Sequence, residues 1–218
     1  MVRESFQEQL NSLRQLIIEM GEQVEKAIDS SMLALVEQNL DLAEKVVMDD
    51  EIIDKLSLEV EDKCTTLLAL QQPMARDLRL ISTAMRIHVD LERMGDYACN
   101  IAKTVLTIGS EPFITSMADL HHMAELARRM ISQNLAAYSK LNRELALQTA
   151  KMDHEIDYLF DKIFKELLAL MTEDPRNIKQ STYLSHIAKY LERIGDRGTN
   201  LSESIMYMIN GERVELNE

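Results

Sequence analysis

The strongest constraint on the fold of this 218-residue chain is an internal repeat at an offset of 100 residues. The segment Leu91–Asp96 (LERMGD) returns as Leu191–Asp196 (LERIGD), and Leu67–Leu70 (LLAL) is found again at Leu167–Leu170. Such self-similarity indicates that one structural unit is present twice.

Each copy carries a helical pattern of apolar residues, spaced alternately by four and three positions over three heptads. In the first copy these residues are Ile87, Leu91, Met94, Ala98, Ile101, Val105 and Ile108, and in the second they are Ile187, Leu191, Ile194, Gly198, Leu201, Ile205 and Met208. Glycine and proline, which favour turns, number only six and three. This scarcity argues against an all-β sandwich or barrel.

The sequence therefore predicts an all-α protein built as two tandem, pseudo-symmetric three-helix bundles of long antiparallel helices. Pro73, the segment Gly109–Pro112 and Pro175 mark the sharpest turns. We expect the first bundle at residues 1–109 and the second at residues 110–218. The six expected helices span about 3–38, 41–70, 75–108, 113–141, 144–171 and 176–210.

The formal net charge is −13, and no stretch of the chain is rich in lysine and arginine. We expect no binding to nucleic acid, because little of such a surface would neutralise phosphates. The chain has no run of about 18 apolar residues, and its first ten residues lack an apolar signal core. We therefore expect a cytoplasmic protein in which Cys64 and Cys99 are reduced core residues.

Acidic pairs at i, i+4 spacing are the main candidate functional feature. That spacing places two carboxylates on one helix face, where they repel each other unless a cation lies between them. Each half of the chain has two such pairs, which we call the first and the second quartet. The first quartet is Asp50, Asp54, Glu92 and Asp96, and the second is Asp153, Asp157, Glu192 and Asp196.

The members of each quartet are expected at one level of an antiparallel helical hairpin. Asp54 and Glu92 are each 19 residues from Pro73, and Asp50 and Asp96 are each 23 residues from it. The members of the second quartet are likewise placed symmetrically in sequence about the hairpin turn beside Pro175. Four level carboxylates offer hard oxygen ligands to a cation. A helical projection places Glu92 and Asp96 roughly 140° and 180° from the apolar seam, so we expect an open surface site.

Two structural interpretations of the quartets stay open at this stage. An acidic helix face is often only solvated, and Arg93 and Arg193 could neutralise the acids through salt bridges. Gly95 and Gly195 lie inside the repeated motif, where glycine costs about 1 kcal/mol relative to alanine. Either room for an ion or tight helix packing would explain these glycines.

The doubled Glu-Arg-x-Gly-Asp motif, with Gln72–Arg79 (QPMARDLR) and Met171–Ile178 (MTEDPRNI), resembles the PhoU family along essentially the whole chain. The resemblance implies two three-helix bundles and surface metal clusters held by paired acidic motifs. It gives the role of metal ligand to all eight quartet residues, with Asn100 and Asn200 as auxiliary ligands one turn further along. It also favours iron or zinc, although oxygen ligands admit magnesium or manganese as well.

Members of the PhoU family are accessory regulators of bacterial phosphate uptake. The resemblance implies coupling of the phosphate ABC transporter to a membrane sensor histidine kinase, with repression of the phosphate-starvation response when phosphate is plentiful. We therefore expect a non-enzymatic, metal-binding homodimer that contacts the transporter's ATPase subunit and the kinase, and reaches the membrane only through them. The alternative is a carboxylate-bridged multinuclear metal enzyme, a hydrolase or an oxidase.

Overall fold

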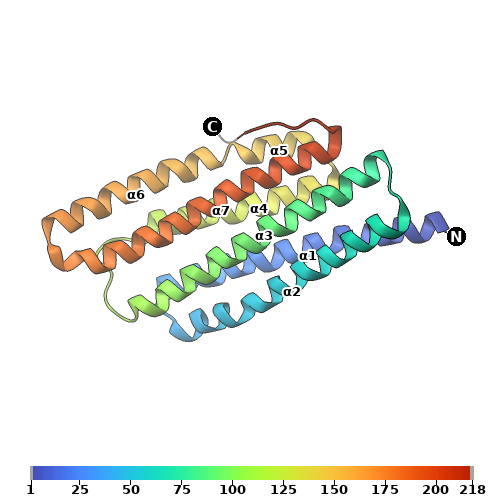
Figure 1. The fold of residues 1–218 in the computed structure, drawn as a ribbon. Coiled ribbons are helices and arrows are strands. Elements are labelled where there is room, and N and C mark those ends of the chain that lie inside the picture. Colours follow the sequence, from blue (N-terminus) through green and yellow to red (C-terminus); the bar gives the residue numbers. More distant parts are fainter. Residues whose placement is uncertain (1, 217–218) are drawn as a thin grey trace.

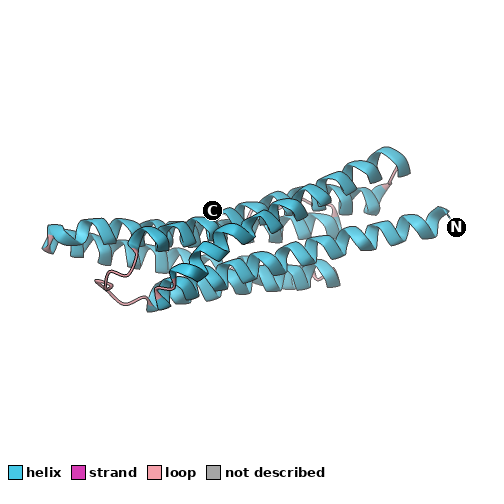
Figure 2. Ribbon diagram, turned by 90° about the horizontal axis from the view of Figure 1, so that it is seen from below, coloured by secondary structure: helices cyan, strands magenta, loops and turns pink. Residues whose placement is uncertain are grey.

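The computed structural model describes the backbone of residues 2–216 and the side chains of residues 6–216. Over this range the chain is all-helical, as predicted, and its helices run close to the long axis of an elongated molecule (Figure 1, Figure 2). The helices are α1 (Val2–Glu37), α2 (Leu40–Gln71), α3 (Ala75–Ile108), α4 (Ala118–Lys140), α5 (Arg143–Ala150), α6 (Asp153–Glu173) and α7 (Ile178–Asn210), and a 3-10 turn at Pro175–Asn177 precedes α7.

Two three-helix bundles pack side by side, which confirms the predicted architecture. The first contains α1, α2 and α3, and the second contains α4, the α5–α6 arm and α7. Helices α3 and α7, which carry the repeated motif, pack against each other along the middle of the molecule (Figure 1). Their apolar seams, including Leu91 and Leu191, are fully buried. At Gly198 an added Cβ would lie 2.9 Å from Met130 Cε, so this small residue lets α4 approach α7.

Asparagine side chains begin two of the helices. The Asn39 side chain accepts a hydrogen bond from the Leu42 amide at 3.0 Å, and Asn142 accepts one from Leu145 at 3.1 Å. These caps satisfy amides that have no partner inside the helix. Both asparagines are therefore turn residues, and each ends a tight connection between antiparallel helices.

The predicted single helix over 144–171 is wrong, because the structure divides it into α5 and α6 at Lys151 and Met152. There the Met152 amide donates to Thr149 O at 3.0 Å, which replaces the four-residue step of an α-helix by a three-residue step. The Thr149 hydroxyl bonds to Gln133 on α4 and fixes the end of α5. No glycine or proline marks this break, so periodicity alone misses it. The break makes Asp153 the first residue of α6.

Two other helix starts lie later than predicted. Residues 109–117 form a loop, so the helix expected from 113 begins at Ala118. The Gln180 side chain holds this loop, because it accepts from the Ile114 amide at 2.7 Å and donates to Pro112 O at 3.0 Å. The helix expected from 176 begins at Ile178, after the 3-10 turn. Within the described range, no helix has the length and apolar character needed to cross a membrane.

Candidate functional site

The first quartet joins the neighbouring helices α2 and α3. Asp50 is partly buried and Asp54 is exposed, while the Glu92 and Asp96 side chains are 26% and 35% exposed. Burial raises the pKa of Asp50, and the charges of Asp54 and Asp96 raise it further. Burial and the charge of Asp96 also raise the pKa of Glu92. The four carboxylates are therefore close enough to repel one another across the two helices, as the level arrangement predicts.

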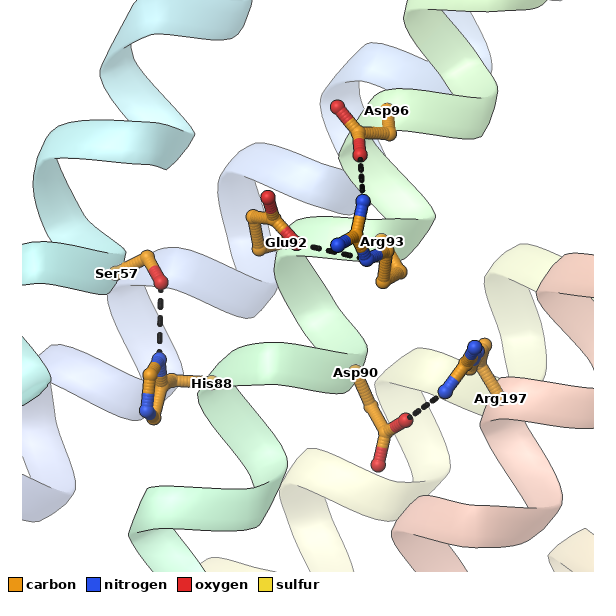
Figure 3. Close-up of polar contacts among 7 residues, drawn as sticks. All are labelled: Ser57, His88, Asp90, Glu92, Arg93, Asp96 and Arg197. Atoms are coloured by element: carbon orange, nitrogen blue, oxygen red, sulfur yellow. Dashed lines mark hydrogen bonds and ion pairs between the residues drawn. The ribbon is translucent and has the colours of Figure 1, made fainter.

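Arg93 lies between the two acids of α3 (Figure 3). Its Nε is 3.4 Å from Glu92 Oε2, and its Nη1 is 3.0 Å from Asp96 Oδ2. The salt-bridge interpretation is thus realised for the α3 pair. Because the Arg93 side chain is half exposed, these contacts contribute little stability. Glu92 and Asp96 could therefore give up Arg93 for another cation.

The second quartet is more deeply buried than the first. Asp153, at the start of α6, is 7% exposed and accepts a hydrogen bond from the Thr199 hydroxyl at 3.1 Å. Lys189 Nζ contacts Glu192 Oε1 at 2.5 Å. The other oxygens, Asp153 Oδ1 and Glu192 Oε2, are buried without a hydrogen bond, although Arg193 Nε forms an ion pair with Glu192 Oε2 at 3.9 Å. Burial, with added repulsion from Asp157, raises the pKa of Asp153 to about 6.

Glycines of the repeated motif bring the helices of each quartet together. At Gly95 an added Cβ would lie 2.9 Å from Ile53 Cδ1, and at Gly195 it would lie 2.5 Å from Asp153 Oδ1. Tight packing therefore accounts for Gly95, whereas Gly195 accommodates a quartet carboxylate. This close approach buries Asp153 and partly covers Asp50 and Glu92, whereas Asp54 and Asp157 stay exposed, so the surface is less open than expected. We call the surface between the two helices of each quartet its groove. The projection of α3 alone could not include the neighbouring helix that covers these acids.

The two grooves differ in chemistry, a difference that the acidic pairs alone do not predict. The Cys99 thiol lies beside Asp50 in the first groove, whereas the Thr199 hydroxyl donates to Asp153 in the second. Burial and the nearby Asp50 charge raise the pKa of the Cys99 thiol to about 11. Cys99 and Thr199 each follow the last acid of the repeated motif by three residues, a spacing that puts them on the same helix face. This three-residue spacing is the sequence feature from which the positions of Cys99 and Thr199 beside the quartets could have been predicted.

Other polar side chains near the motif have partners of their own. His88 Nδ1 lies 2.9 Å from Ser57 Oγ, and Asp90 on α3 binds Arg197 on α7 at 2.9 Å (Figure 3). Asn200 also bonds to Asp90, which places it in a separate pocket between α3 and α7 that contains no quartet residue. Asn100 is partly exposed on α3. The auxiliary-ligand role of the two asparagines stays a prediction.

The donor set of the grooves fits a cation in its chemistry. As the side chains stand, no three His, Cys, Asp or Glu residues of the described range converge closely enough to hold an ion. The exposed Asp54 and Asp157 side chains would have to turn inward. In the second groove Asp153 Oδ1 has no hydrogen-bond partner, and Glu192 Oε2 has only a contact of 3.9 Å to Arg193 Nε. A bound cation would satisfy both oxygens, because a buried carboxylate oxygen without a hydrogen bond is costly.

These features define a class of duplicated helical-bundle proteins with one acidic groove in each repeat. The sequence matches the family model described as PhoU domain over residues 17–105 and 120–205. The chain belongs to the PhoU family.

Curated relatives and solved structures agree with this assignment. A phosphate-specific transport system accessory protein PhoU homolog from Clostridium acetobutylicum is 40% identical over 219 residues and covers 100% of both chains. A homolog of the same description from Rhizobium meliloti is 41% identical, over 96% of this chain and 89% of its own. The names are those of transport accessory proteins, in line with the expected non-enzymatic role.

Two crystal structures share the fold over nearly the whole chain. PhoU from Pseudomonas aeruginosa aligns with a TM-score of 0.91 and 30% identity, covering 95% of this chain and 100% of that one. The phosphate transport system regulatory protein PhoU from Streptococcus pneumoniae aligns with a TM-score of 0.89 and 31% identity, covering 96% and 99%. The likeness therefore extends across both bundles.

Proposed function

We propose that this protein regulates a phosphate-specific transport system as a cytoplasmic adaptor. The observation that carries the proposal is the 40% identity, over the full length of both chains, to a relative named as an accessory protein of such a system. In this role the protein contacts the transporter's ATPase subunit and a membrane sensor histidine kinase, and it represses the phosphate-starvation response when phosphate is plentiful. Formation of a homodimer is part of the proposal.

Metal ions held by the two quartets are the second part of the proposal. The first-quartet residues would bind one ion or cluster between α2 and α3, and the second-quartet residues would bind another between α6 and α7. A bound cation would supply positive charge that offsets the mutual repulsion of the carboxylates. The support is the raised pKa of Asp50, Glu92 and Asp153, together with the buried Asp153 Oδ1, which has no hydrogen-bond partner.

Metal titration of the purified protein tests the second part. Zinc, ferrous iron and manganese are titrated into chelator-treated protein, with stoichiometry measured by calorimetry and elemental analysis. Converting the acids of one quartet to amides is expected to remove the ions of that quartet only. The matched control converts Glu44, Glu59 and Glu173, which are exposed and outside the quartets. Unchanged stoichiometry in both quartet variants would exclude the proposed sites.

Gene deletion in the native host tests the regulatory part. Without the protein, phosphate-starvation genes are expected to stay active in phosphate-rich medium, because the transporter no longer reports to the kinase. The wild-type gene should restore repression, and a variant lacking both quartets should not. Normal repression in the deletion strain would count against the regulatory role, whatever the metal content of the protein.

A further inference from the structure

A small cavity lies at the end of the molecule where the α2–α3 turn meets the C-terminal ends of α4 and α7. It has a volume of about 60 Å³, which is space for about two water molecules or one small ion. No quartet residue borders it. The cavity is lined by Arg14, Arg76, Leu80, Leu141, Met208 and Ile209.

The two arginines of this cavity lack acidic partners. Within the described part of the chain, neither Arg14 nor Arg76 forms an ion pair or a side-chain hydrogen bond, and Arg14 Nε is buried without a partner. The chain has 37 acidic residues against 24 lysines and arginines, so acids are in excess. The nearby Arg79 instead donates to Met208 O at 3.4 Å and thus serves the end of α7.

The arginine equivalent to Arg76 in the second repeat has an acidic partner, which Arg76 lacks. Arg176 is the equivalent of Arg76 at the 100-residue offset, and it binds Asp174 through Nε at 2.8 Å and Nη2 at 2.6 Å. The residue equivalent to Asp174 is Met74, which is 78% exposed and carries no charge. The repeats therefore share the arginine, but only the second supplies an acid to neutralise it.

We propose that Arg14 and Arg76 bind a small oxyanion of the phosphate type in this cavity. Guanidinium groups present paired N–H donors that match phosphate oxygens, and a bound anion would supply the partner that Arg14 Nε lacks. Arg14 is partly buried beside the leucine and methionine side chains of the wall, whereas Arg76 is exposed and forms the open side of the cavity. The charge of Arg14 also acts on Tyr138, whose buried hydroxyl has no hydrogen-bond partner but does not line the cavity.

The site is separate from the quartets in position and in chemistry. Arg76 precedes Glu92 by 16 residues on α3, which corresponds to about 24 Å at 1.5 Å per residue. Binding of phosphate to this cavity therefore does not depend on metal in the grooves. Conversely, a failure of the metal proposal would leave this one intact.

Inorganic phosphate, titrated calorimetrically into the full chain after chelator treatment, tests the proposal. The chelator excludes phosphate held through metal ions. One phosphate is expected to bind per chain, and Arg14→Gln and Arg76→Gln should each weaken binding about tenfold or more, since each removes a charge-assisted contact. Arg176→Gln is the matched control and should leave the affinity unchanged. Absence of phosphate binding, or equal weakening by Arg176→Gln, would overturn the proposal.

Met74→Asp separates lost binding from lost folding. This variant places an aspartate at the position equivalent to Asp174, which pairs with Arg176 in the second repeat. The new aspartate should pair with Arg76 in the same way and weaken phosphate binding about tenfold. Met74 is also the N-cap of α3 and provides no side-chain cap, whereas aspartate is a favoured cap. The melting temperature should therefore rise while the affinity falls. Undiminished phosphate affinity in a folded Met74→Asp protein would contradict the role of Arg76.

Discussion

Asp153 is the most deeply buried of the eight quartet acids. One of its oxygens accepts from Thr199, and the other has no hydrogen-bond partner. Burial is the main cause of its raised pKa, and the charge of Asp157 is the next. The residue thus carries an electrostatic cost in the metal-free protein that a cation would relieve.

The stability of the metal-free protein should fall as the pH rises from about 4 to about 6. The pKa of Asp153 is about 6 in the folded protein against an ordinary 3.8, so the folded state binds the proton more tightly over this interval. At 1.36 kcal/mol per pKa unit, the free energy of unfolding should drop by about 2 to 3 kcal/mol and then stay level. Urea unfolding across this pH range, with chelator present, measures the drop.

Asp153→Asn is the variant that assigns this pH dependence. An asparagine cannot ionise and can still accept from Thr199, so the variant should be more stable than wild type at pH 7 and lose most of the slope. The remainder comes from other acids with raised pKa, such as Asp50 and Glu92. Asp161→Asn, at an exposed position of the same helix, is the control and should keep the full slope. An unchanged slope in Asp153→Asn would show that another group is responsible.

The two motif glycines should respond differently to alanine. Gly195→Ala places a methyl group 2.5 Å from Asp153 Oδ1, on a short and buried side chain that has little room to move. The strain should exceed the gain of about 1 kcal/mol in helix propensity and leave a net loss of about 1 kcal/mol. Gly95→Ala contacts chiefly the end of Ile53 and should be near neutral. Thermal unfolding compares the two, and an equal effect would contradict the asymmetry.

Two contacts at equivalent repeat positions join α3 to α7. Asp90 binds Arg197, and at the 100-residue offset Tyr190 stacks on Tyr97 with ring centroids 6.1 Å apart. One pseudo-symmetric contact is therefore ionic and the other aromatic. Asp90 is buried, so its charge depends on Arg197 and Asn200 for compensation.

Removing the cation of this pair should destabilise the protein more than removing the anion. Arg197→Met would leave Asp90 buried without its counter-charge, at an expected cost of about 2 kcal/mol, because the side chain of Arg197 is about a third exposed and solvent screens part of the effect. Asp90→Asn should cost less than 1 kcal/mol, and combining the two should recover stability. Chemical unfolding of the variants tests this order. Lys179→Met is the control, because it removes an exposed cation of the same helix whose partner, Glu111, is also exposed.

The sequence predicted the elements that obey simple periodicity. The helix over 75–108 is found with those bounds, since Pro73 and Gly109 flank an unbroken apolar seam. The break between α5 and α6 was missed because no breaker residue marks it, and the hydrogen bond of Thr149 to Gln133 that accompanies it joins two separate helices. The level arrangement of the quartets followed from spacing, whereas their burial and the unequal partners Cys99 and Thr199 depend on the neighbouring helices.

The whole molecule combines two acidic grooves, a net charge of −13 and an elongated shape (Figure 2). Long helices give the chain extended faces that can dock other proteins. Cations in the grooves would lower the negative charge that a partner meets and would stiffen each helical hairpin. The central claim is that these grooves and faces serve an adaptor of phosphate transport.

A pull-down from native membranes of phosphate-fed cells tests that claim most directly. Tagged wild-type protein is compared with a variant in which all eight quartet acids are amides, and the proteins recovered are identified by mass spectrometry. The adaptor proposal predicts recovery of a phosphate-transporter ATPase subunit and a sensor histidine kinase with the wild type, and reduced recovery with the variant. Recovery of neither partner by a folded, metal-loaded wild-type protein would contradict it.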